Sequence, residues 1–219
     1  MRSERAPGAR DIIGAIEQVV GDAARPLALH EPLFAGNERA YVQSCIDEGW
    51  VSSAGAFVDR FERDLAQYCG AKHAVVVVNG TCAIHAALVA LGVRPGEEVL
   101  IPSLTFVATA NAVTHAGAVP HFVEAEETSL GVDPDALAAY LSRIAVCREG
   151  STVNTQTGRV IRALMPVHVF GHPCRMEELS RVAAEYGLLL VEDATEALGS
   201  SAHGKKVGST HTAVFSFNG

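Results

Sequence analysis

Apolar and polar residues alternate along the chain with two periods, and these periods predict a succession of strands and helices. From residue 74 onward, short apolar runs are separated by longer segments in which apolar residues recur every three or four positions. The runs predict buried strands, and the longer segments predict helices that pack on them. The predicted strands are 74–78, 98–102, 119–123, 161–169, 188–191 and 213–217, and the predicted helices are 11–21, 37–49, 57–69, 82–91, 105–116, 176–186 and one that begins at Asp133.

Strands separated by helices predict a mostly parallel sheet between two helical layers, which is the three-layer arrangement of an α/β domain. We assign residues 37–219 to this domain. Residues 1–36 are predicted to form an N-terminal helix and an extended arm, because Pro26 and Pro32 disfavour helical conformation in the residues before them. The polar segment 147–159 is predicted to be an exposed loop.

Composition and charge exclude several classes of protein. With 48% apolar and 19% charged residues, the chain of 219 residues can bury a sizeable core. Its net charge of −8 argues against a nucleic-acid partner and against binding to an anionic membrane. No apolar run reaches the length of a membrane span, and no secretory signal is visible behind Met1. Five scattered cysteines without a Cys-x-x-Cys pair indicate reduced side chains in a cytoplasmic protein.

The apolar run 188–191 ends in two acids, Glu192 and Asp193, after which the chain turns through small residues. In open α/β sheets, the carboxyl ends of the strands border the ligand crevice. A carboxylate at that place is poorly hydrated and requires a positive partner, and no Lys or Arg lies beside Asp193 in the sequence. A protonated ring nitrogen of a ligand would supply the partner. The alternative is that Asp193 caps a following helix.

Other strand ends carry further candidate ligand contacts. Asn79-Gly80-Thr81 joins a predicted strand to a helix start, where free amides, a glycine and a hydroxyl would bind a phosphate. The alternative is an ordinary turn in which Thr81 is a helix cap. Phe106 would cover a flat ligand or be a core aromatic residue. Ser216 would add a hydroxyl to the same phosphate or be a satisfied polar residue of its strand.

Two segments imitate known binding motifs. Residues 199–206 nearly spell a P-loop, but Lys206 stands where Ser or Thr must contact magnesium, and no helix is predicted to follow. A P-loop nucleotide-binding protein is therefore a weak alternative. The segment 168–174 contains two histidines and a cysteine, but its glycine and proline exclude a helix that would align the histidines. We expect no metal site there.

Taken together, the ordered motifs resemble the DegT/DnrJ/EryC1/StrS family of sugar aminotransferases from about Leu29 onward. The motifs are Glu48-Gly-Trp-Val-Ser-Ser, Phe61-Glu, Asn79-Gly-Thr, Pro102-Ser-Leu-Thr-Phe-Val-Ala-Thr-Ala-Asn111, Glu192-Asp-Ala-Thr-Glu-Ala-Leu-Gly-Ser and Phe215-Ser-Phe-Asn-Gly. The family implies pyridoxal 5'-phosphate (PLP) as the cofactor and the large α/β domain of the aspartate aminotransferase, or type I, fold. Segments 29–34, 168–173 and 196–200 resemble the LegC-like branch of the family.

The resemblance assigns roles to individual residues. Gly80, Thr81 and Ser216 would hold the cofactor phosphate, and Phe106 would stack on the ring. Asp193 would pair with the pyridine nitrogen and keep it protonated, so that the ring can accept electrons.

Two features depart from the family pattern. Glu196 falls where many relatives carry Gln or His beside the ring oxygen, so this contact is expected to differ. The Schiff-base lysine of the family is expected just beyond Gly219, and the lysines of this chain (Lys72, Lys205, Lys206) do not occupy its place. No catalytic residue is therefore assigned within the chain. We expect a truncated large domain without the small C-terminal domain.

For a complete protein, the resemblance implies a homodimeric aminotransferase that transfers an amino group from glutamate to a nucleotide-linked 4-keto-6-deoxy sugar. The LegC-like segments favour UDP-4-keto-6-deoxy-N-acetylhexosamine. For the 219-residue chain alone we predict no transaminase activity. Two alternatives stay open: a non-catalytic fragment that binds the cofactor or the nucleotide sugar, and a pyridoxamine-phosphate-dependent sugar dehydratase in which the lysine is replaced.

Overall fold

The computed structural model describes residues 7–21 and 32–217. The chain divides into two compact units, residues 1–43 and residues 44–218. The helices are α1 (Ala9–Val20), α2 (Glu38–Asp47), α3 (Ala56–Cys69), α4 (Gly80–Ala90), α5 (Val107–His115), α6 (Pro134–Ile144), the 3-10 helix η1 (Val169–Gly171) and α7 (Met176–Glu185). The strands are β1 (Glu98–Pro102), β2 (Val119–Val123), β3 (Ala145–Arg148), β4 (Ser151–Asn154), β5 (Ile161–Leu164), β6 (Leu189–Asp193), β7 (Ser201–Ala202), β8 (Lys205–Lys206) and β9 (Thr212–Val214).

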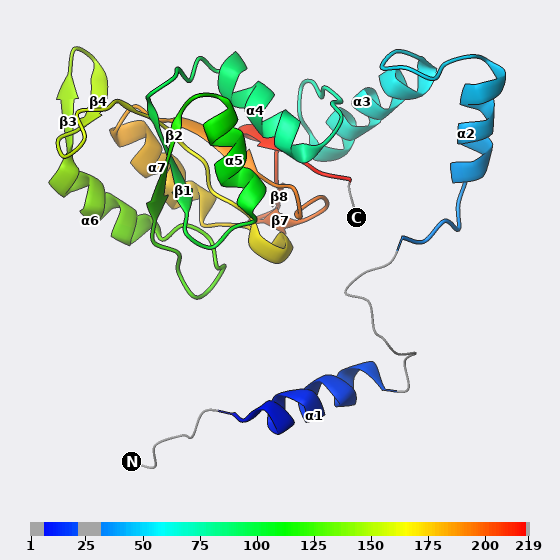
Figure 1. The fold of residues 1–219 in the computed structure, drawn as a ribbon, viewed down its shortest axis with the longest axis horizontal. Coiled ribbons are helices and arrows are strands. Elements are labelled where there is room, and N and C mark those ends of the chain that lie inside the picture. The colour runs from blue at the N-terminus through cyan, green and yellow to red at the C-terminus, as the bar shows by residue number, and fades with distance from the viewer. Residues whose placement is uncertain (1–6, 22–31, 218–219) are drawn as a thin grey trace. The chain divides into compact units, whose positions relative to one another are not determined.

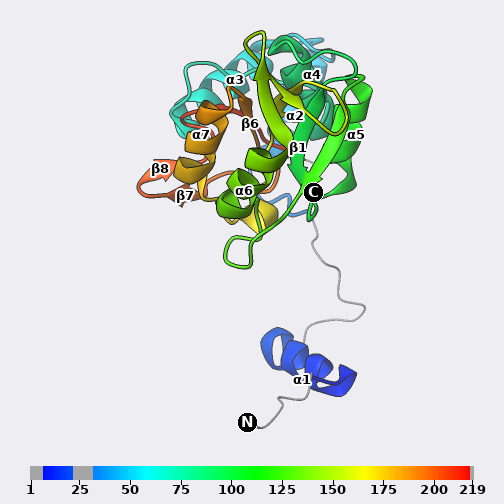
Figure 2. The ribbon, with the colours of Figure 1, turned by 90° about the vertical axis from the view of Figure 1, so that its left-hand side faces the viewer.

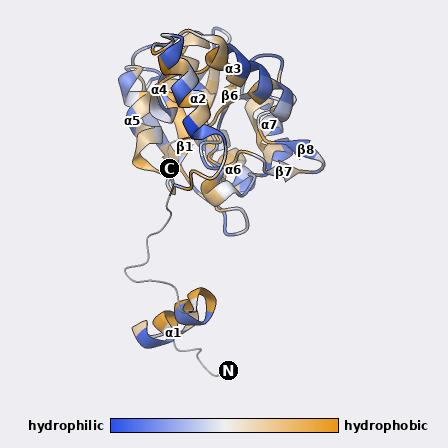
Figure 3. Ribbon diagram, turned by 90° about the vertical axis from the view of Figure 1, so that its right-hand side faces the viewer, coloured by the Kyte–Doolittle hydropathy of each residue, from blue (hydrophilic) through white to orange (hydrophobic). Residues whose placement is uncertain are grey.

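The first unit contains the predicted N-terminal helix. At the start of α1, the Gly8 amide donates a hydrogen bond of 2.9 Å to the Asp11 carboxylate. The ribbon of α1 is hydrophobic along one side and hydrophilic along the other (Figure 3). At least half of the surface of Ile12, Ile13, Ile16 and Val19 is exposed. Most of the predicted extended arm, residues 22–31, lies outside the described residues.

The second unit is built on a five-stranded sheet with the order β2-β1-β5-β6-β9. All four strand pairs are parallel. Helices α4 and α5 cover one face, while α6 and α7 cover the other (Figures 1 and 2). The predicted three-layer α/β fold is therefore confirmed. Within the described residues, no helix is both long and apolar enough to cross a membrane.

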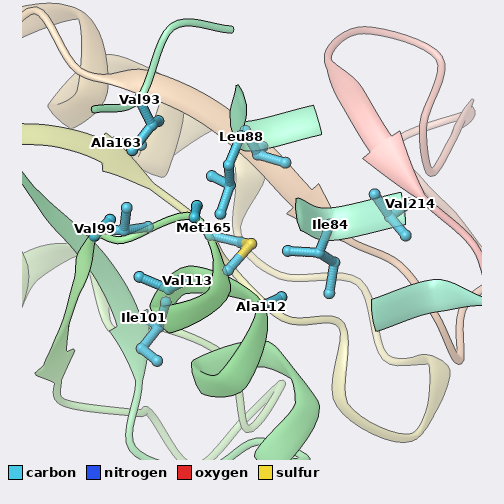
Figure 4. Packing of buried hydrophobic residues seen from close by; sticks show 13 residues of the cluster. Ile84, Leu88, Val93, Val99, Ile101, Ala112, Val113, Ala163, Met165 and Val214 are labelled. Atoms are coloured by element: carbon cyan, nitrogen blue, oxygen red, sulfur yellow. The ribbon is translucent and has the colours of Figure 1, made fainter. Parts of the chain in front are cut away.

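The alternation of side chains along the strands divides the core into two clusters. In β1, Val99 and Ile101 face α4 and α5, whereas Leu100 faces α6 and α7. Figure 4 shows the first cluster, in which Met165 and Val214 pack with residues of the two helices. The same alternation in β6 directs Asp193 toward α5 and Glu192 toward α7, so two adjacent acids reach opposite faces of the sheet.

The predicted strand 74–78 is wrong, because these residues have no strand conformation in the structure. Val75 and Val78 are 78% and 83% exposed. β-Branched residues favour a strand only where a neighbouring strand supplies hydrogen bonds and a surface to pack on. None of the strands in the described part of the chain pairs with this segment.

The predicted exposed loop 147–159 is also wrong in its first half, because β3 and β4 form an antiparallel hairpin there. Its Asn154 is 1% exposed and donates a hydrogen bond of 2.9 Å to Glu98. Thr157 and His121 bind the same carboxylate at 2.6 and 2.8 Å. Burial by itself raises the pKa of Glu98, but these three hydrogen bonds outweigh it and hold the pKa below its usual range.

Two predicted strands are shorter than expected. The segment 161–169 forms a strand only over β5 and then continues into η1, where Phe170 has a positive φ of 53°. The segment 213–217 forms β9 one residue earlier and ends at Val214. Ser216 therefore follows the strand instead of lying within it.

Candidate functional site

Asp193 is the last residue of β6, and its side chain is held by two threonine hydroxyls. Thr109 Oγ1 donates to Asp193 Oδ2 at 2.7 Å, and Thr195 Oγ1 donates to Oδ1 at 2.8 Å. The Thr195 amide also approaches Oδ1, at 3.3 Å. Asp193 is 2% exposed. A turn follows instead of a helix, so the alternative in which Asp193 caps a helix is wrong.

The hydroxyl contacts extend from Asp193 through α5 to the residues that precede it. Thr105 lies two residues before α5, and 2.7 Å separates its hydroxyl oxygen from that of Thr109. Because Thr109 donates its proton to Asp193, its oxygen accepts from Thr105. This arrangement gives the carboxylate neutral donors but no cation within the described residues. A cationic ligand group would therefore find an acceptor whose position is fixed.

Gly80 lies beside Thr195 and Ser216. A Cβ atom at position 80 would lie 3.1 Å from Thr195 Cγ2 and 3.2 Å from Ser216 Cβ, so this corner is too tight for a larger residue. Thr195 thus contacts the Gly80 corner with its methyl group and Asp193 with its hydroxyl. The parallel register pairs Asp193 with Val214, which places Ser216 two residues beyond that level. The structure therefore brings Gly80, Asp193 and Ser216 together.

Helix α4 begins at Gly80, and its cap is Asn79. The Asn79 side chain accepts a hydrogen bond of 2.9 Å from the Cys82 amide. The alternative in which Thr81 is the cap is therefore wrong. The amides of Gly80 and Thr81 donate to no acceptor among the described residues. Free amides at the start of a helix are suited to bind a phosphate.

Phe106 and Glu196 stand at the edges of this region. Phe106 directly precedes α5 and is 73% exposed, so the alternative of a core aromatic residue is wrong. Glu196 accepts a hydrogen bond of 2.8 Å from the Phe170 amide, and its carboxylate thus holds the turn of η1. Phe170 is one of four non-glycine residues with a positive φ within the described residues. In this structure, Glu196 therefore has a structural partner on the backbone.

The two imitated motifs do not form the sites that they resemble. Residues 199–206 form the β7–β8 hairpin, which no helix follows. The Lys206 ammonium donates to the Tyr68 carbonyl at 2.6 Å and lies 3.6 Å from the centre of the Tyr68 ring. His168 is fully buried and binds Glu192 at 3.0 Å. No cluster of three or more metal-ligand side chains occurs in the described part of the chain.

Sequence reasoning found the acid but missed the residues that hold it. Thr109 lies inside a helix and 84 positions from Asp193, so no local pattern connects them. Thr195 belongs to the motif that begins at Glu192, and its position two residues after a strand-end acid is typical of a side chain that closes a turn. That spacing is a signal for Thr195, whereas no spacing in the sequence indicates that Thr109 binds Asp193.

The geometry defines a class of protein: a three-layer α/β domain with an acid, a glycine and a hydroxyl gathered at the carboxyl ends of parallel strands. The chain belongs to the DegT/DnrJ/EryC1/StrS aminotransferase family, whose sequence model matches residues 33–219. The resemblance predicted from the motifs is thereby confirmed.

The chain is similar to several named enzymes and solved structures. GDP-perosamine synthases of Caulobacter vibrioides and Vibrio cholerae are 43% and 40% identical to this chain over 194 residues. Among solved structures, 3-amino-5-hydroxybenzoic acid synthase matches with a TM-score of 0.74 at 32% identity, over 88% of this chain and 47% of that one. DesI, solved with its TDP-sugar product, also matches with a TM-score of 0.74 at 32% identity, over 90% and 46% of the two chains.

The matched regions define how much of such an enzyme is present. The alignments with the two synthases cover 88% of this chain and 48% of each relative, so the chain spans about half the length of the curated relatives it matches. The three lysines of this chain lie at positions 72, 205 and 206. Lys205 and Lys206 belong to β8, which precedes the strand that leads to Ser216.

The residues at the site fit the cofactor of the family. Gly80 leaves room where a Cβ atom would be in tight contact with Thr195 and Ser216. The free amides at the start of α4 are suited to a phosphate, and the buried Asp193 carboxylate is suited to a protonated ring nitrogen.

Proposed function

We propose that this chain provides the cofactor-binding half of a PLP-dependent sugar aminotransferase. The observation that carries the proposal is the Asp193 carboxylate, which is buried, held by two hydroxyls and set beside the Gly80 corner. Gly80, Thr81 and Ser216 would hold the phosphate, and Phe106 would cover the ring. When bound, the cofactor supplies an electron-accepting ring through which an amino group passes.

Asp193 would act on the ring nitrogen without itself exchanging a proton. Its two oxygens accept hydrogen bonds from Thr109 and Thr195, and such bonds stabilise a carboxylate more than a neutral acid. A carboxylate in this position keeps the opposing nitrogen protonated. Glu196 would approach the ring from the η1 side only if its bond to the Phe170 amide were exchanged.

The proposed substrate is a nucleotide-linked 4-keto-6-deoxy sugar, and glutamate is the proposed amino donor. Two relatives named for GDP-perosamine favour a GDP-linked sugar. The LegC-like segments favour the UDP-linked N-acetylhexosamine. The family resemblance further supports a cytoplasmic homodimer.

A fusion protein would test the activity. Residues 1–219 would be joined to the C-terminal half of the Caulobacter vibrioides GDP-perosamine synthase, and glutamate-dependent amination would be measured with GDP-linked and UDP-linked 4-keto-6-deoxy sugars. We expect amination by the fusion and none by the fusion carrying Asp193→Asn. An inactive fusion that still binds pyridoxamine phosphate would contradict the proposed activity and favour the alternative of a non-catalytic fragment that binds the cofactor.

The 219-residue chain alone gives a second test. We expect it to bind pyridoxamine phosphate reversibly, which 31P NMR of the phosphate would detect. Treatment with PLP and borohydride, followed by mass spectrometry, is expected to show no stoichiometric cofactor adduct on a single lysine. A single fully labelled lysine would contradict the assignment, because Lys72, Lys205 and Lys206 lie outside the predicted position.

A further inference from the structure

A cavity lies on the face of the sheet opposite to Asp193. It has a volume of about 380 Å³ and lies between the start of α7, the β7–β8 hairpin and the residues that lead into β9. Figures 2 and 3 show the hairpin beside α7. The polar and charged residues of its lining include Glu177, Ser180, Glu192, His203, Lys205 and His211.

Glu192 places a buried carboxylate on the wall of this cavity. It is 2% exposed. Its Oε2 atom accepts a hydrogen bond of 3.0 Å from His168 and a longer one of 3.3 Å from the Gly208 amide. Its Oε1 atom accepts none from the described residues. Because no fully buried polar side-chain atom of these residues lacks a partner, Oε1 keeps some accessible surface. We infer that the cavity, which Glu192 lines, supplies this surface.

The neighbouring histidine cannot neutralise this carboxylate. The Cys174 amide donates a hydrogen bond of 3.0 Å to His168 Nδ1, so that nitrogen carries no proton. The proton of the neutral ring is therefore on Nε2, where it is donated to Glu192. A negative charge with one unused oxygen remains at the cavity wall. Its best complement is a charged hydrogen-bond donor such as an ammonium group.

Ser180 has no proton left to donate into the cavity. Ser180 donates its hydroxyl proton to the Met176 carbonyl at 2.6 Å. The contact of 3.1 Å between Ser180 and His211 is consequently donated by His211 Nε2. Cys174 also lines the cavity, and burial raises the pKa of its thiol to about 12, so it is a neutral wall and not a nucleophile.

The hairpin adds a cation to the lining of the cavity. Lys205 lines it and forms no ion pair with any described residue. Lys206 lines it as well, but its ammonium is bound to the Tyr68 carbonyl and stacked on the Tyr68 ring. The cavity therefore combines a buried acceptor with an exposed, uncommitted cation. A small zwitterion could pair with both charges, because its ammonium group complements the acceptor and its carboxylate complements the cation.

We propose that this cavity binds a small zwitterion, of which a free α-amino acid is the simplest. The ammonium group would bind Glu192 Oε1, and the carboxylate would face Lys205. The volume is at the lower end of the range of ligand pockets, which suits a ligand of this size. The proposal does not depend on the cofactor, because the cavity and Asp193 lie on opposite faces of the sheet.

The test is a titration of the 219-residue chain, without cofactor, by 1H–15N NMR. The probes are L-alanine, propionate, which lacks the amine, and propylamine, which lacks the carboxylate. We expect saturable shifts of the Ser180, Val207 and His211 amides with alanine, at a dissociation constant on the order of 1 mM. Each half-probe is expected to bind at least about tenfold more weakly, a loss of about 1.4 kcal/mol.

Three variants locate the two ends of the ligand. Glu192→Gln keeps the shape but removes the charge, and we expect alanine binding to weaken about tenfold. Lys205→Met is expected to weaken it about threefold. Lys206→Met is the matched control. It removes the same charge from the same strand, but the Lys206 ammonium is bound to the Tyr68 carbonyl and is not available to the ligand. Asp193→Asn is expected to leave alanine binding unchanged.

Thermal unfolding monitored by circular dichroism would show that each variant is folded. Absence of saturable shifts with alanine in the unaltered chain would overturn the proposal. Propylamine or propionate binding as tightly as alanine would overturn the assignment to a zwitterion. Equal losses in Lys205→Met and Lys206→Met would show that the hairpin acts only through its net charge, which would also overturn the placement of the carboxylate.

Discussion

Glu192 and Asp193 are adjacent, equally buried and of the same charge, yet they lie on opposite faces of the sheet and have different hydrogen-bond donors. Asp193 has a donor on each oxygen, from Thr109 and Thr195. Glu192 has both donors on one oxygen and leaves the other open to the cavity. Both acids are 2% exposed, so burial alone does not distinguish the candidate cofactor-binding acid from its neighbour.

The hydrogen-bond donors of each carboxylate determine which of its oxygens a ligand can reach. The donors of Asp193 are hydroxyls that fix its orientation, and a ligand must approach it alongside them. The donor of Glu192 is an imidazole whose tautomer is fixed by the Cys174 amide. We therefore expect the contacts of Glu192 to matter most for folding and those of Asp193 to matter most for the cofactor.

The largest effect is expected from His168→Leu. This change removes the main donor of a buried carboxylate and leaves only the long bond from Gly208. A buried charged group without its partner is costly, so we expect the free energy of unfolding to fall by about 3 kcal/mol. Urea denaturation followed by circular dichroism would measure it.

His211→Leu is the control for this change, because it alters a half-buried histidine at the same cavity that contacts only the Ser180 hydroxyl. We expect it to lower the free energy of unfolding by about 1 kcal/mol or less. Equal losses for the two variants would show that the His168–Glu192 pair has no special weight in folding.

The next effect concerns the cofactor. Asp193→Asn removes the charge opposite the proposed ring nitrogen but keeps groups that can bond to both threonines. We expect pyridoxamine phosphate to bind at least about tenfold more weakly, while the free energy of unfolding changes by less than about 1 kcal/mol. Glu192→Gln should leave cofactor binding unchanged. The reverse pattern would contradict the separation of the two faces.

The sequence predicts features of these two acids that depend on neighbouring residues, and it does not predict those that depend on contacts between distant parts of the chain. The strand 188–191 and its terminal acids were predictable, because a buried run that ends in charge is a local pattern. The donor Thr109 was not, since its hydroxyl reaches Asp193 through the folding of α5 against the sheet. The fixed tautomer of His168 likewise depends on a backbone amide six residues away.

The two wrong segments fail for the same reason. Residues 74–78 have strong strand propensity, but no neighbouring strand in the described residues pairs with them. The segment 147–159 looked featureless, but Asn154 and Thr157 are held by a carboxylate more than fifty residues earlier. Local propensity predicts an element only where long-range contacts agree with it.

A third buried carboxylate, Glu98, is expected to make the free energy of unfolding depend on pH. Burial raises the pKa of Glu98, but the hydrogen bonds from Thr157, Asn154 and His121, together with the charge of His121, hold it below its usual range. Its stabilising contribution is therefore complete above the unfolded value near 4.3 and is lost as the pH falls through the lower folded value. We expect Glu98→Gln to flatten the decrease in unfolding free energy in this acid range. An unchanged acid profile, measured by urea denaturation between about pH 3 and pH 6, would remove this assignment.

The smallest effect is expected from Thr109→Val, which removes one of two hydroxyl donors to Asp193 without changing the size of the side chain. We expect a loss of about 1 kcal/mol in unfolding free energy and a weakening of pyridoxamine phosphate binding of about threefold. Thr114→Val is the matched control on the same helix, because the exposed Thr114 hydroxyl bonds only to the Ala110 carbonyl of its own helix. In the Asp193→Asn background, the effect of Thr109→Val on cofactor binding should shrink, since the two residues act as a pair. If the two changes are additive instead, Thr109 supports the fold and does not position the acid.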